Sequence, residues 1–134
     1  MATGRPLILV VDDDEAMRDA MAATLEAAGY EAISARTATQ ALALLRSGGV
    51  RPSLIFLDLV MPEMSGVEFR AAQLQDEALE AIPVVFVSAF PNTVDVLQSG
   101  GRLHAAGVLR KPVDAGKLLA VVRRLCPPPE SSSA

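Results

Sequence analysis

Five short apolar runs alternate along the chain with stretches in which apolar residues recur at helical spacing. We predict that these runs are strands, at 7–11, 30–35, 54–57, 83–87 and 107–109. Because runs such as Leu7–Val11 carry no alternation of apolar and polar residues, both faces of the strands should be buried. Strands that alternate with helices indicate an α/β fold, with a parallel sheet covered on both faces.

The segments between the strands carry helix signals. Apolar residues at helical spacing predict helices at 17–28, 38–45, 67–75, 93–99 and 118–125. We expect Asp14, Thr37 and Asp114 to act as N-caps. The helix at 93–99 is predicted to be weak, because Gly100 and Gly101 follow it directly. The domain should therefore span 6–126, and 127–134 should be a Pro/Ser-rich tail or the stump of a linker.

Composition narrows the class of protein. The 134 residues suit one domain, and 51% of them are hydrophobic, with no Trp, one Tyr and four Phe, so the core should be aliphatic. The net charge of −4 weighs against a nucleic-acid surface. The single cysteine, Cys126, cannot form an internal disulfide, and no apolar run is long enough to span a membrane. We expect a soluble, cytoplasmic domain.

Polar residues follow four of the predicted strands. Asp12 and Asp13 come after the first strand, Asp58 after the third, Ser88 after the fourth and Lys111 after the fifth. Parallel α/β sheets bind ligands beyond the carboxyl ends of their strands, so these side chains should converge on one edge. Taken singly, each has an ordinary structural interpretation as a helix cap, a turn residue or a surface charge.

Crowded carboxylates need a cation. Two carboxylates about 4 Å apart repel each other by roughly 4 kcal/mol at an effective dielectric constant near 20. An oxygen-only ligand set without His or Cys favours a hard ion, and Mg²⁺ is the usual one. An ionised aspartate beside that ion can act as a nucleophile toward phosphorus. Lys111 could neutralise the transferred phosphoryl group, and Ser88 could donate a hydrogen bond to it.

These motifs resemble those of a known family, the receiver domains of bacterial two-component response regulators. The resemblance covers about residues 6–126, and it is carried by Val10–Asp14, Leu57–Gly66, Val87–Ala89 and Lys111–Pro112. It implies a flavodoxin-like, doubly wound five-stranded parallel sheet in the order 2-1-3-4-5, with helices on both faces. It also implies a cis Lys111–Pro112 peptide bond.

The resemblance assigns a role to each strand-end residue. Asp58 would accept a phosphoryl group from a sensor histidine kinase or a phosphotransfer protein. Mg²⁺, with Mn²⁺ as the alternative, would be bound by Asp58, Asp13, the backbone carbonyl of Val60 and, mainly through water, Asp12. Ser88 would reorient toward the phosphoryl group, and Lys111 would pair with it.

The same resemblance implies a signalling domain of a phosphorelay rather than an enzyme. It would catalyse at most its own phosphorylation and dephosphorylation, and phosphorylation would shift its conformation and its binding to an output partner or effector domain. We expect no contact of this domain with nucleic acid or membrane, and either a monomer or a weak dimer linked to phosphorylation.

One position departs from the family pattern. Receivers usually carry Tyr or Phe three residues before the lysine, and here that residue is Val108. A valine has no ring that could swing inward. Either the output change runs through the loop at Ala89–Pro91 and the weak helix that follows, or Val108 simply packs in the core.

Two other functions compete with the receiver interpretation. Asp12-x-Asp14 after a buried strand resembles the motif of haloacid-dehalogenase-type phosphatases, in which Asp12 would be the nucleophile and Asp14 the acid/base. That interpretation leaves Asp58 unexplained, and the chain has no room for a cap domain. The other possibility is a pseudo-receiver, which binds partners without being phosphorylated.

Overall fold

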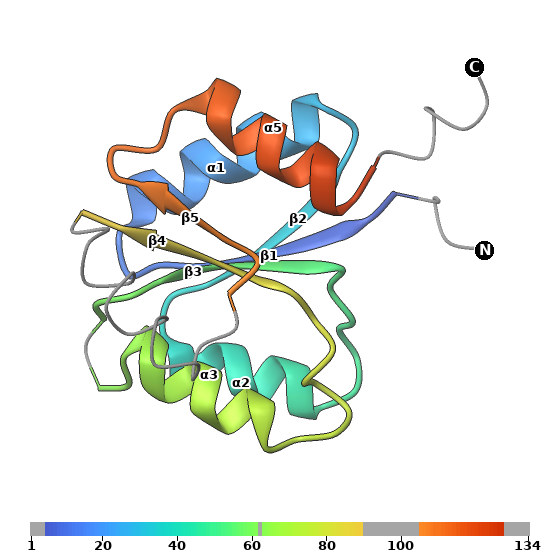
Figure 1. The fold of residues 1–134 in the computed structure, drawn as a ribbon, viewed down its shortest axis with the longest axis vertical. Helices are drawn as coiled ribbons and strands as arrows, with labels where there is room; N and C mark the ends of the chain where they lie inside the picture. Colours follow the sequence, from blue (N-terminus) through green and yellow to red (C-terminus); the bar gives the residue numbers. More distant parts are fainter. Residues whose placement is uncertain (1–4, 62, 90–104, 128–134) are drawn as a thin grey trace.

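A single parallel sheet forms the centre of the molecule. The computed structural model describes residues 5–61, 63–89 and 105–127. Its strands are β1 (Leu7–Val11), β2 (Glu31–Ala35), β3 (Leu54–Asp58), β4 (Val84–Ser88) and β5 (Gly107–Arg110). They are all parallel, in the order β2-β1-β3-β4-β5. The predicted fold class and strand order are confirmed (Figure 1).

Helices cover both faces of this sheet (Figure 1). On one face lie α1 (Glu15–Ala27) and α5 (Ala115–Leu125), and on the other lie α2 (Ala38–Arg46) and α3 (Gly66–Leu74). The three predicted N-caps are confirmed, because the side chains of Asp14, Thr37 and Asp114 each accept a backbone N–H from the first turn of their helix. The helix predicted at 93–99 lies outside the described residues.

Strands β3, β4 and β5 each run one residue further than predicted. Their last residues are Asp58, Ser88 and Arg110. Asp58 pairs in register with Val87, and Ser88 pairs with Arg110. Because ladder pairing uses only backbone atoms, a polar side chain does not end a strand whose neighbour continues. The side chains of Asp58 and Ser88 are therefore held by strands of the sheet.

Each strand contributes to two apolar cores, one on each face. From β1, Leu9 and Val11 pack toward α2 and α3, whereas Ile8 and Val10 pack toward α1 and α5. All five residues of β3 are buried. Burial on both faces, as the sequence indicated, is found for the central strands β1, β3 and β4. The edge strands β2 and β5 differ, because Glu31, Ser34 and Arg110 are exposed. Met21 on α1 is also in the core.

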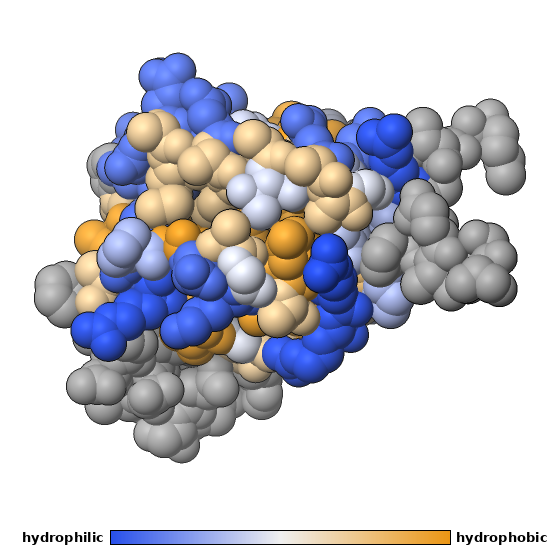
Figure 2. Space-filling model, turned by 90° about the horizontal axis from the view of Figure 1, so that it is seen from above, coloured by the Kyte–Doolittle hydropathy of each residue, from blue (hydrophilic) through white to orange (hydrophobic). Residues whose placement is uncertain are grey.

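The outer side of α1 is also weakly apolar. Its exposed residues include four alanines at helical spacing: Ala16, Ala20, Ala23 and Ala27. Figure 2 looks onto the side of the molecule that carries α1 and α5, and it shows a weakly hydrophobic area bordered by hydrophilic residues. Only the side with Met21 and Leu25 packs on the sheet, because these longer side chains bury more apolar area.

A buried polar pair holds the segment between α3 and β4. Gln73 is fully buried, and its side-chain amide donates to the carbonyl oxygens of Leu79 and Ile82 at 2.9 Å each. Its side-chain oxygen accepts from Arg70 Nη1 at 2.8 Å. The segment between α3 and β4 is neither strand nor helix, and Gln73 supplies hydrogen bonds to these two carbonyls. The chain is thereby fixed where it enters β4.

A buried tyrosine directly before β2 holds the C-terminal end of α5. Tyr30 is fully buried, and its hydroxyl donates to the carbonyl oxygen of Cys126 at 2.7 Å. Cys126 is the C-cap of α5, and its thiol lies 3.5 Å from the carbonyl oxygen of Ser53. This contact fixes how α5 lies across the sheet.

Tyr30→Phe tests that contact. The substitution keeps the ring and removes the donor to a buried carbonyl, so the free energy of unfolding should fall by roughly 1–2 kcal/mol. Urea unfolding followed by circular dichroism measures it. Thr24→Val removes a hydroxyl that bonds at the exposed surface of α1, to Ala20, and should cost less than about 0.5 kcal/mol. Equal losses in both variants would contradict the assignment.

Candidate functional site

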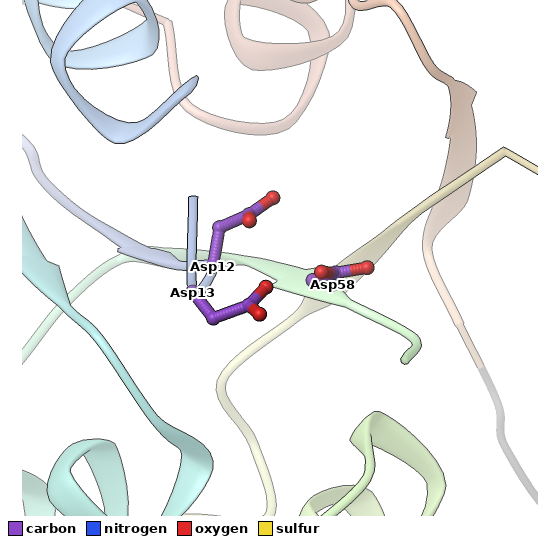
Figure 3. Close-up of side chains that lie close together, drawn as sticks. All are labelled: Asp12, Asp13 and Asp58. Atoms are coloured by element: carbon purple, nitrogen blue, oxygen red, sulfur yellow. The ribbon is translucent and has the colours of Figure 1, made fainter. Parts of the chain in front are cut away.

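Three carboxylates meet at the carboxyl edge of the sheet (Figure 3). Asp12 and Asp13 follow β1, and Asp58 ends the neighbouring strand β3. One oxygen of each carboxylate lies within 4.8 Å of the others. Asp12 and Asp58 are buried, and Asp13 is exposed. The predicted strand-end residues thus come together because β1 and β3 are adjacent.

A lysine ammonium joins the two buried carboxylates. Lys111 Nζ lies 3.1 Å from Asp12 Oδ2 and 3.1 Å from Asp58 Oδ2. Lys111 follows β5, and its backbone N–H donates to the carbonyl oxygen of Ser88 at 2.9 Å. This bond holds the lysine backbone against the end of β4, and the side chain reaches the end of β3 from there. The Lys111–Pro112 peptide bond is cis, as predicted.

Burial and charge shift the pKa values of this pair. Burial raises the pKa of Asp58, and the nearby charge of Asp12 raises it further, although bonds from Lys111 and from the backbone N–H of Val60 oppose the rise. Burial alone would lower the pKa of Lys111, but its bonds to Asp12 and Asp58 outweigh that effect and raise it. The ammonium of Lys111 therefore stays charged, whereas burial disfavours the anionic form of Asp58.

The site opens to solvent through a shallow hollow of about 320 Å³. Residues at the ends of four strands, β1, β3, β4 and β5, line it: Asp13, Asp14, Asp58, Val60, Ser88, Ala89 and Lys111. Val60 and Ser88, both singled out from the sequence, therefore lie beside Asp58. Asp12 is not part of the lining, and it accepts the N–H of Asp14 at 2.9 Å through the oxygen that does not contact Lys111.

The residues present fit a hard divalent cation. Three carboxylates and one ammonium leave a net charge of about −2 if all are ionised, which matches one Mg²⁺ or Mn²⁺. The ligand atoms are all oxygens, and Asp13 faces the hollow, where water can complete the coordination. Asp13, Asp58 and the carbonyl of Val60 could hold the ion, and Asp12 lies behind them.

A glycine that the sequence analysis did not single out supports Asp58 from behind. Gly66, the first residue of α3, donates its N–H to the carbonyl of Leu59 at 2.9 Å. A Cβ at this position would lie 2.6 Å from the carbonyl oxygen of Asp58. The sequence signal for this contact was a glycine directly after Ser65, the N-cap of α3. The first turn of a helix does not need the conformational freedom of glycine, so a glycine there indicates that another backbone segment lies close to it.

Val108 packs where receivers usually carry an aromatic ring. It is partly buried, pairs in register with Phe86 and contacts the core on the α2 and α3 side. This observation supports the simple packing role. The alternative output route falls largely on 90–104, outside the described residues, and only Ala89 of its loop is described.

Fold and site together define a class: parallel α/β domains with an acidic cluster and a lysine at the strand ends. The family model for the response regulator receiver domain matches residues 8–123. The chain therefore belongs to the receiver domain family of two-component response regulators, a family of signalling domains.

Similar proteins come from several bacteria. The "DNA-binding dual master transcriptional regulator RpaA" of Synechocystis is 36% identical over 90% of this chain and 48% of its own length. The "Polar-differentiation response regulator DivK" of Brucella anthropi is 31% identical over 87% of this chain and 92% of its own. The Vibrio cholerae chemotaxis protein CheY4 has a solved structure with a TM-score of 0.79 and 30% identity, over 90% and 98% of the two chains.

The coverage differs among these relatives. The chain spans about half the length of several curated response regulators that it matches, RpaA among them. By contrast, it spans nearly the whole of DivK and CheY4. None of the helices in the described ranges is long and apolar enough to cross a membrane.

Gly66→Ala should displace Asp58. The added methyl group cannot fit against the Asp58 carbonyl, so the backbone of β3 or α3 must shift, at a cost of roughly 1–3 kcal/mol in the free energy of unfolding. Gly49→Ala is the matched control, because its Cβ would meet only the hydroxyl of Ser47, at 3.6 Å. Urea unfolding compares them, and equal stability of the two variants would contradict the close approach.

Asp58→Asn should stabilise the metal-free protein at neutral pH. A carboxyl whose folded-state pKa is raised above 3.8 destabilises the fold when ionised, and this cost disappears as the pH falls through the folded-state pKa. The excess stability of Asp58→Asn over the wild type should therefore be largest near pH 7 and shrink toward pH 4. Denaturant unfolding in EDTA measures it, with Asp19→Asn as an exposed control. An excess that grows on acidification would contradict the raised pKa.

Proposed function

We propose that this receiver domain accepts a phosphoryl group on Asp58 in a Mg²⁺-dependent reaction with a histidine kinase or phosphotransfer protein. One observation carries the proposal: the buried carboxylate of Asp58 faces a hollow shared with Asp13, Ser88 and Lys111. A nucleophile, an acidic ligand, a hydroxyl donor and an ammonium are thereby within one small site. Domain limits of 6–126 and a cytoplasmic location belong to the same proposal.

Asp58 would attack phosphorus through one carboxylate oxygen. The P–N bond of a phosphohistidine breaks, its electron pair leaves with the imidazole, and an acyl phosphate forms on Asp58. When bound, Mg²⁺ supplies charge neutralisation between the carboxylates and the incoming phosphoryl oxygens. Lys111, already 3.1 Å from Asp58 Oδ2, stabilises the added charge, and the Ser88 hydroxyl donates a hydrogen bond to it.

The output would pass to a partner. Two relatives are named as DNA-binding regulators, and this chain covers about half of each. A DNA-binding function of a longer protein would therefore lie outside the receiver, whose own net charge is −4. The added phosphoryl group carries about −1.5 to −2 charges, which is enough to change the contacts of Lys111 and Ser88. The domain would act as a monomer or as a weak, phosphorylation-linked dimer.

The phosphatase interpretation has less support. It requires Asp12 as nucleophile, but Asp12 does not line the hollow, whereas Asp58 does. It also requires Asp14 as acid/base, although Asp14 Oδ1 accepts the N–H of Met17 as the cap of α1. Asp58 has the position that a nucleophile needs.

Labelling with acetyl phosphate separates the candidates. The wild type should take up one phosphoryl group in Mg²⁺ and none in EDTA, as read by intact mass. Asp58→Asn should lose this uptake completely, whereas Asp12→Asn should retain measurable uptake at a lower rate. Asp19→Asn, an exposed change on α1, is the control and should behave as the wild type.

Two results would overturn the proposal. Loss of uptake in Asp12→Asn with full uptake in Asp58→Asn would favour the phosphatase. No uptake by the wild type with either acetyl phosphate or a phosphorylated histidine donor would indicate a pseudo-receiver.

A further inference from the structure

We propose that Arg18 is a positioning residue for the divalent cation site, acting through the backbone of Asp12. This inference rests on the proposed function, because it assumes that Asp13 and Asp58 bind the ion. Arg18 lies on α1, and its Nη1 donates to the carbonyl oxygen of Asp12 at 2.8 Å. The bond links α1 to the backbone of the residue directly before Asp13, one of the proposed metal ligands.

Every polar atom of Asp12 has a partner. Its N–H donates to the carbonyl of Ala35 on β2 at 3.2 Å, and its two carboxylate oxygens contact the N–H of Asp14 and the ammonium of Lys111. Arg18 satisfies the remaining atom, the carbonyl oxygen. Since Asp12 is only 2% exposed, that carbonyl would otherwise depend on scarce water for a hydrogen bond.

The carbonyl of Asp12 determines where Asp13 lies. The carbonyl of Asp12 and the N–H of Asp13 belong to one planar peptide unit, so a donor that fixes the oxygen also fixes the direction in which the chain reaches the Asp13 Cα. In the part of the chain that the structure describes, no hydrogen bond or ion pair holds the Asp13 carboxylate itself. Its place in the cluster therefore depends on the backbone that Arg18 anchors.

Charge and positioning predict opposite effects of Arg18 on metal affinity. A guanidinium that bonds to the backbone beside the acidic cluster repels a divalent cation, so its charge alone would weaken binding of Mg²⁺. The hydrogen bond, by holding the carboxylates in place before the ion arrives, would strengthen binding. The sign of the change on removing the guanidinium therefore tells which of the two effects dominates.

The experiment titrates Mg²⁺ into the full chain by calorimetry at pH 7. Arg18→Met keeps the length of the side chain without the donor, and its Kd for Mg²⁺ should rise roughly ten-fold. Arg18→Lys keeps one donor and the charge, and should recover most of the affinity. Arg51→Met removes the same charge at the opposite end of β3 and should leave the Kd within about two-fold. Because salt screens charge effects more than hydrogen bonds, the ten-fold loss should persist in 0.5 M KCl.

A second measurement separates positioning from a general loss of stability. In EDTA, the ¹³C shift of the Asp12 carbonyl should change in Arg18→Met and not in Arg51→Met, since only the former loses the bond. Tighter or unchanged Mg²⁺ binding in Arg18→Met would overturn the proposal, as would weaker binding without a change at the Asp12 carbonyl. If the wild type itself shows no saturable Mg²⁺ binding, the proposed function fails. If the wild type binds Mg²⁺ and Arg18→Met binds it with the same Kd, this inference alone fails.

Discussion

The constraint on which this structure depends is the crowding of like charges at the carboxyl edge of the sheet. Asp12 and Asp58 are both buried there, and each would repel the other strongly without a cation. Lys111 supplies one positive charge 3.1 Å from both. This compensation is incomplete, because the pKa of Asp58 remains raised by burial and by Asp12. A second cation at this edge of the sheet would therefore stabilise the ionised form of Asp58.

Much of this arrangement could be predicted from the sequence. The apolar runs defined the strands, and the parallel α/β class then placed Asp12, Asp13, Asp58, Ser88 and Lys111 at one edge. What the sequence could not supply was the sharing of one ammonium by two carboxylates. That contact requires β3, β4 and β5 to be neighbours in that order, with a long side chain reaching past the end of β4.

Contacts between helix residues and distant segments could not be predicted from the sequence, for a different reason. Gln73 and Arg70 occupy polar positions in the pattern of α3, and polar helix residues normally face solvent. They are buried only because the segment leading to β4 folds back over them and offers carbonyl oxygens. Arg18 and Gly66 are similar, since each acts on the backbone of a residue from another element. Periodicity reports which face of an element is apolar, and it carries no information on which backbone atoms lie opposite.

The ends of β4 and β5 couple the site to the rest of the molecule without an aromatic side chain. The N–H of Lys111 donates to the carbonyl of Ser88, so the lysine and the hydroxyl residue share a backbone link. Under the proposed function, a phosphoryl group on Asp58 would draw both side chains toward one new charge. A displacement of the Ser88 backbone would then move the N–H of Lys111, which lies three residues before Asp114, the N-cap of α5. Val108, which packs against the core and pairs with Phe86, has no ring that could swing, and this backbone link needs none.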